Sequence, residues 1–130
     1  MNTEAMRYAL EGSESGKLIF PEVVKTLLDA GVESYFIDFI RGEDTFYLSD
    51  GCTHIEKMTV ALAPVAEDFS QPALIAAIRA AQADTIRYPE FVRQATAAGV
   101  AGYRACLTGK RVVYIGRKGD LHVEEFPRPS

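Results

Sequence analysis

One pattern of apolar and polar positions occurs twice in this chain. Residues 20–32 (FPEVVKTLLDAGV) and 88–100 (YPEFVRQATAAGV) each carry a proline at their second position and end in Gly-Val. Proline is tolerated in the first turn of a helix, and glycine readily adopts the left-handed conformation that ends one. Each segment therefore predicts a short helix, and the first has an apolar face formed by Val23, Val24, Leu27 and Leu28.

After each Gly-Val the pattern changes to the alternation of a β-strand. In residues 32–40, Tyr35, Ile37 and Phe39 are predicted to face a core, which leaves Ser34, Phe36 and Asp38 on the other face. The remaining predictions are helices at 2–11, 70–83 and 88–98, a polar loop at 12–16, a turn at 41–44, strands at 45–48, 53–63, 100–107, 110–115 and 121–126, and a frayed tail at 126–130.

The repeat extends well beyond the helix. Residues 20–57 align with 88–125 at a shift of 68 positions (89 − 21), which matches Tyr35 with Tyr103, His54 with His122 and Glu56 with Glu124. Sliding the hairpin by one residue also matches Tyr47 with Tyr114. We predict an α+β fold in which two related helix–helix–three-strand units form an antiparallel sheet packed by short helices.

The two units, about 1–66 and 67–127, are expected to form a single domain over 1–130 and to pack around a pseudo-twofold axis, as in a homodimer. Composition agrees with a soluble globular protein, at 48% apolar and 25% charged residues. No apolar run approaches the roughly 20 residues that cross a bilayer, and the N-terminus does not resemble a signal peptide. A cytoplasmic location with no membrane partner, and with Cys52 and Cys106 reduced, is therefore expected.

Charge is unevenly distributed between the halves. The net charge of −4 combines five Lys/Arg and eleven Asp/Glu in residues 1–65 with nine and seven in residues 66–130, that is −6 and +2. The basic excess of the second half is sparser than the basic face of a typical nucleic-acid reader, so no nucleic-acid partner is expected.

The assembled segments resemble an uncharacterised bacterial and phage family, the domain-of-unknown-function family DUF 1398, some members of which are labelled "phage envelope protein". The resemblance rests on FPE at 20–22, AGVESYFID at 30–38, TFY at 45–47, YPEF at 88–91 and VEEFP at 123–127. It covers about residues 5–127 and implies a fold without an established activity. In that family the second copy usually has an aspartate at the position of Cys106, so the resemblance argues against a site that needs a carboxylate from both halves.

The two His-x-Glu pairs are candidate metal ligands. On a strand, residues i and i+2 share a face, so His54 projects with Glu56 and His122 with Glu124. If pseudo-twofold packing joins the pairs, two imidazoles and two carboxylates could bind zinc or another divalent ion. The alternative is that each pair forms a polar cross-strand contact on a solvated face.

A second candidate site surrounds the first hairpin. Asp38, Arg41, Tyr35 and Tyr47, together with Tyr103 and Tyr114 of the second half, could form a ligand-binding cleft. The alternative is a surface ion pair and tyrosines that pack in the core. The chain has no phosphate loop, dinucleotide fingerprint or GxSxG motif, so no catalytic residue is assigned and no cofactor is expected.

The leading hypothesis is a small binding or interaction protein whose site lies at the seam of the two halves. An unknown small molecule, another protein or a second copy of the chain in a homodimer stay open as the partner. The alternatives are a metal-assisted or hydrolase-like enzyme that uses the His-x-Glu pairs, and a self-assembling structural or phage-associated protein.

Overall fold

The computed structural model describes residues 1–127, so the last three residues of the predicted tail lie outside the described part of the chain. The helices are α1 (Thr3–Glu14), α2 (Phe20–Asp29), α3 (Gln71–Gln82) and α4 (Tyr88–Ala97). The strands are β1 (Val32–Asp38), β2 (Glu43–Leu48), β3 (Thr53–Lys57), β4 (Val100–Cys106), β5 (Arg111–Gly116) and β6 (Leu121–Glu125). The α+β class is confirmed.

Every element of the second half begins and ends 68 residues after its counterpart in the first half, as in 71 − 3 for the helices and 125 − 57 for the strands. The repeat therefore also includes α1 and α3, which precede the segment that the sequence aligned. The helix–helix–three-strand pattern is confirmed in both halves.

The six strands form one antiparallel sheet in the order β3-β2-β1-β4-β5-β6. The halves join where β1 pairs with β4, and Phe36 lies opposite Arg104 in that pairing. These two residues are themselves 68 positions apart, so the pseudo-twofold axis passes between them. The junction of the halves thus has the geometry of an isologous homodimer contact built within one chain.

The hairpin register keeps the constant shift, and the one-residue slide suggested by the sequence is wrong. Asp38 pairs with Glu43 in the first half, and Cys106 pairs with Arg111 in the second. The counterpart of Tyr47 is therefore Ile115 and not Tyr114. A slip of one residue would have moved every side chain of the strand to the opposite face of the sheet.

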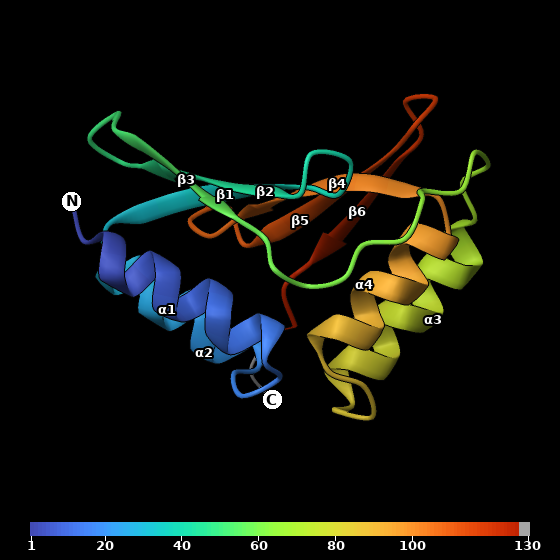
Figure 1. Cartoon of the computed structure of the whole chain (residues 1–130), viewed down its shortest axis with the longest axis horizontal. Helices are drawn as coiled ribbons and strands as arrows, with labels where there is room; N and C mark the ends of the chain where they lie inside the picture. The colour runs from blue at the N-terminus through green and yellow to red at the C-terminus, as the bar shows by residue number, and fades with distance from the viewer. Residues whose placement is uncertain (128–130) are drawn as a thin grey trace.

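All four helices lie against one face of the sheet, with one helix pair beneath each half (Figure 1). The core lies between these layers, and Tyr35, Ile37 and Phe39 face it as predicted, at 5% exposure or less. Within residues 1–127 no helix covers the opposite face of the sheet, and none is long and apolar enough to cross a membrane.

Several predicted boundaries are wrong. β1 ends at Asp38 and not at residue 40, and β2 begins at Glu43, so Asp44 lies in this strand and not in the predicted turn at 41–44. The first helix does not end at the predicted loop but continues through Gly12 to Glu14. Gly12 is a packing position and not a helix end, since a Cβ there would lie 2.3 Å from Leu18 Cδ1. The third strand ends at Lys57 and not at residue 63. Residues 58–70 instead form an irregular connection that leads to α3, where Ser70 caps the helix as predicted by accepting a hydrogen bond from the Ala73 N–H.

The connection between the halves is fixed to the second half by backbone contacts. The Ala66 N–H donates to the Thr96 carbonyl at 3.0 Å, and the Ser70 N–H donates to the Ala98 carbonyl at 2.7 Å. Gly99 permits this close approach, because its φ is +91° and a Cβ there would lie 2.3 Å from the Asp68 carbonyl oxygen. The connection therefore runs against the end of α4.

Candidate functional site

A pocket of about 420 Å³ lies at the seam of the two halves, between the sheet and the two helix pairs. We call it the seam pocket. Its walls come from every helix and from every strand except β3, and they are mainly aliphatic and aromatic. Phe20 of α2 and Phe126, which follows β6, meet edge to face along its lining with ring centroids 5.2 Å apart. Both halves are therefore needed to form it.

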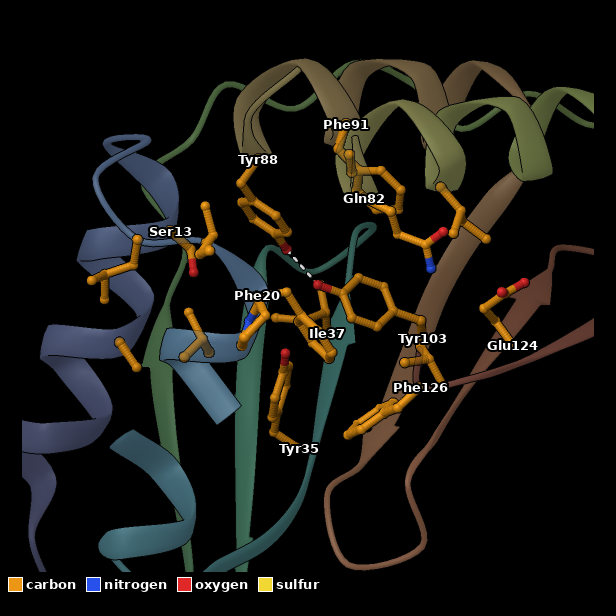
Figure 2. A pocket seen from close by; sticks show the side chains of 18 of the residues that line it. Ser13, Phe20, Tyr35, Ile37, Gln82, Tyr88, Phe91, Tyr103, Glu124 and Phe126 are labelled. Atoms are coloured by element: carbon orange, nitrogen blue, oxygen red, sulfur yellow. Dashed lines mark hydrogen bonds between the residues drawn. The ribbon is translucent and has the colours of Figure 1, made fainter. Parts of the chain in front are cut away.

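Four tyrosines line the seam pocket, and Figure 2 shows three of them with their side chains directed into it. Tyr35 and Tyr103 are counterparts on β1 and β4, whereas Tyr88 begins α4 and Tyr114 lies on β5. The Tyr88 and Tyr103 hydroxyl oxygens are 2.8 Å apart and share a hydrogen bond. The ring of Tyr103 packs on that of Tyr114 with centroids 5.4 Å apart.

Burial keeps these hydroxyls protonated. It raises the pKa of Tyr35 and of Tyr103 well above the ordinary value, and nearby Asp44 adds to the effect on Tyr35. Burial also raises the pKa of Tyr88 and Tyr114, although the hydrogen bond with Tyr103 opposes it at Tyr88. The phenols therefore act as neutral hydrogen-bonding groups in an apolar wall.

Asp44 is the unusual member of the lining. It projects from β2 toward the helices, is 3% exposed, and its Oδ1 has no hydrogen-bond partner among residues 1–127. Burial first, and then the charges of Glu14 and Glu56, raise its pKa well above the ordinary value. Burial in such a place favours the neutral acid, which can donate a hydrogen bond.

The second half shows that the fold itself does not need this carboxyl. Asp44 pairs with Ile37 across β1 and β2, and the equivalent pairing of β4 and β5 places Val112 opposite Ala105. Val112 is 5% exposed and also lines the seam pocket. The same structural position therefore accepts an apolar side chain in one half and holds an orphaned acid in the other.

The structure divides the six predicted ligand-binding residues between the two faces of the sheet. Tyr35, Tyr103 and Tyr114 lie together in the seam pocket. Tyr47 lies on the uncovered face, where the Arg104 guanidinium stacks 4.6 Å from its ring centroid. Asp38 accepts hydrogen bonds from the backbone N–H groups of Ile40 and Arg41, and the Arg41 side chain pairs with Glu43 at 2.9 Å.

Asp38, Arg41 and Tyr47 therefore do not share a cleft with the other three tyrosines. Asp38 closes the β1–β2 turn, and the Arg41–Glu43 pair lies on the surface beside it. The groups that the sequence missed are Tyr88, at the start of a helix, and Asp44. The apolar residues Phe46 and Phe91 complete the aromatic wall around them.

The glutamate of each His-x-Glu pair links an edge strand of the sheet to a helix, β3 to α1 and β6 to α3. His54 bonds Glu56, which also pairs with Arg7 of α1 at 3.3 Å. His122 bonds Glu124 at 3.2 Å, and Glu124 pairs with Arg79 of α3 at 2.7 Å. Burial alone would raise the pKa of each glutamate, but these hydrogen bonds outweigh it and lower the pKa of both.

The two pairs do not converge. They lie on β3 and β6, which are opposite edges of the sheet. Five strand spacings of about 4.8 Å separate these edges by about 24 Å. Since metal–ligand bonds are only about 2.0–2.3 Å long, both pairs together cannot bind one ion. Within residues 1–127 no group of three or more His, Cys, Asp or Glu side chains is placed to hold a metal.

The fold and the seam pocket together define a class of protein: a duplicated α+β unit whose halves enclose an apolar, tyrosine-lined cavity. The family model described as "Protein of unknown function (DUF1398)" matches residues 9–125. The chain therefore belongs to the DUF1398 family. No curated protein matches it.

Proposed function

We propose that this protein binds a small molecule in the seam pocket. The observation that carries the proposal is a cavity of about 420 Å³ enclosed by both halves and containing the orphaned carboxyl of Asp44. Ligand sites in proteins are typically concave, mostly apolar and about 300–1,000 Å³ in volume, with a few polar groups that orient the ligand. The tyrosine hydroxyls and Asp44 are such groups.

The asymmetry between the halves supports the proposal. A buried polar group without a partner costs about 1–3 kcal/mol of stability. The valine at the equivalent position of the second half avoids this cost, as Val112 is buried without a polar atom in its side chain. Groups with a shifted pKa or without a hydrogen-bond partner cluster at functional sites, where their role in binding explains why they are kept at a cost in stability.

The test is binding of a neutral apolar fluorophore, N-phenyl-1-naphthylamine, whose emission rises in an apolar cavity. The variant Ala81→Trp places an indole at an exposed alanine of α3 that lines the pocket. The matched control is Ala76→Trp, at an exposed alanine of the same helix outside the pocket lining. The wild-type chain and the control are expected to bind the dye. Ala81→Trp is expected to lose most of this binding.

Both variants change exposed positions, so both are expected to keep the wild-type far-ultraviolet circular dichroism spectrum. Absence of saturable dye binding to the wild-type chain would refute the proposal. So would equal dye affinity in Ala81→Trp and Ala76→Trp, because the dye would then bind elsewhere on the protein.

A further inference from the structure

The polar groups of the seam pocket offer more hydrogen-bond donors than they use. In the Tyr88–Tyr103 pair, one hydroxyl donates to the other at 2.8 Å, so the proton of the accepting hydroxyl is left to donate to a third group. The Tyr35 hydroxyl points into the same space (Figure 2). A ligand atom that accepts hydrogen bonds would use these protons.

Asp44 adds a further donor. As the neutral acid it carries one hydroxyl proton, and its Oδ1 has no partner among the described residues. Glu14 and Glu56 oppose its ionisation, as does its burial. Asp44 and Tyr35 both line the seam pocket, and the charge of Asp44 acts on Tyr35. A protonated carboxyl and tyrosine hydroxyls in one apolar cavity are groups that stabilise a ligand oxygen.

The charges around the pocket disfavour an anionic ligand. Its acidic lining residues are Asp44, Asp84, Glu124 and Glu125. Arg87 is the basic residue among the described lining residues, and its guanidinium is already bound to Asp84 at 2.8 Å and to the Gly16 carbonyl at 3.0 Å. A carboxylate or phosphate entering the cavity would lose its hydration without gaining a free cation.

We infer that the ligand of the seam pocket is an uncharged, mainly apolar molecule with a hydrogen-bond-accepting oxygen, such as a cyclic ketone, that meets Asp44 and the tyrosine hydroxyls. This inference rests on the proposed function and names the ligand class for the same site. The aromatic walls bind the hydrocarbon part of such a molecule, and the donors fix its oxygen. An organic ammonium ion is the competing class, because aromatic faces attract cations.

Three bicyclic probes of matched shape separate these classes: tetralin, 1-tetralone and 1-aminotetralin. Each is titrated into the full chain by calorimetry and by displacement of N-phenyl-1-naphthylamine. The wild-type protein is expected to bind 1-tetralone about two- to tenfold more tightly than tetralin, which is the contribution of a typical hydrogen bond. The ammonium form of 1-aminotetralin is expected to bind more weakly than the ketone.

Two variants assign this preference to Asp44. Asp44→Val removes the donor and places in the first half the side chain that the second half already has, so the preference for the ketone is expected to fall toward onefold. Asp44→Asn keeps an N–H donor at the same position and is expected to retain part of the preference. Tetralin affinity is expected to stay similar in both variants.

The outcomes distinguish the two proposals. If tetralin binds as tightly as 1-tetralone, if the amine binds most tightly, or if Asp44→Val keeps the full ketone preference, the inferred ligand class is overturned while the seam pocket remains a binding site. If none of the three probes binds although the dye binds in the seam pocket, the inferred ligand class is likewise overturned. If the dye does not bind either, the proposed function fails together with the inference.

Discussion

Replacing Asp44 by valine is expected to stabilise the protein. Asp44 is 3% exposed, its Oδ1 lacks a partner among residues 1–127, and its counterpart Val112 is buried at 5% exposure. Removing a buried polar group that has no partner recovers about 1–3 kcal/mol. Valine also suits a strand and is the residue that the second half holds at the equivalent position. Asp44→Val is therefore expected to raise the free energy of unfolding by about 1–3 kcal/mol where the carboxyl is uncharged, and by more at neutral pH.

The gain is expected to depend on pH, because burial and the charges of Glu14 and Glu56 raise the pKa of Asp44. The folded protein then holds this proton more tightly than the unfolded chain does. Between the unfolded pKa of about 3.9 and the raised folded pKa, wild-type stability falls relative to the variant by up to about 1.4 kcal/mol per pH unit as the pH rises. Below about pH 3.9 this part of the difference disappears, and only the uncharged, unsatisfied polar group remains.

The assay is urea unfolding followed by circular dichroism from about pH 4 to about pH 8. Comparison with the variant is essential, because the lowered pKa values of Glu56 and Glu124 make the opposite contribution to the pH dependence of the wild-type protein. Asp44→Asn is expected to remove the pH-dependent part alone. The reciprocal variant Val112→Asp is expected to lose stability, and to lose more at the higher pH.

A lower stability of Asp44→Val at neutral pH would refute this reasoning, since it would mean that the carboxyl has a stabilising partner. A stability difference of the same size across the pH range would refute the linkage, because it would show that the folded protein and the unfolded chain hold the Asp44 proton equally. The first result would also remove the asymmetry that supports the proposed function.

Two further predictions use matched positions of the fold and the same unfolding assay. Gly31→Ala is expected to lower the free energy of unfolding by about 1–2 kcal/mol through its positive φ alone, since a Cβ there meets nothing within 4 Å. Gly99→Ala is expected to lower it by at least about 2 kcal/mol more, because the Asp68 backbone must move. Equal losses would contradict the tight connection described above. Arg104→Ala is expected to cost about 0.5–1 kcal/mol by losing its contacts with the rings of Phe36 and Tyr47, whereas the exposed Arg111→Ala should change stability by less than about 0.5 kcal/mol. No difference between the two arginine variants would contradict a stabilising stack at the pseudo-twofold axis.

The candidate site was only partly predictable from the sequence. Alternation placed Tyr35 on the core face of its strand, and the repeat placed Tyr103 at the equivalent position of the second half. Asp44 also carried a signal, because in the strand that contains Phe46 and Leu48 it occupies the apolar register, and the constant shift matches it with Val112. That signal was hidden because the predicted turn at 41–44 included Asp44, and because the one-residue slide of the hairpin removed the comparison with Val112.

The grouping of Asp38, Arg41 and Tyr47 with the other tyrosines failed for a different reason. Neighbouring residues on a strand point to opposite faces, so closeness in sequence does not place side chains in one cavity. Which face becomes a pocket depends on where the helices pack. Tyr88 reaches the pocket from the first turn of α4, although it is distant in sequence from the strand residues that it contacts.

The sequence by itself determined the elements and their duplication. Proline and glycine act locally through backbone geometry, and the two-residue alternation of a strand can be recognised without knowing which strands pair with it. Only the tertiary structure decided that β1 and β4 meet at the centre, because that pairing depends on contacts between residues far apart in the chain. The central pairing sent His54 and His122 to opposite edges and brought the tyrosines of both halves together around Asp44.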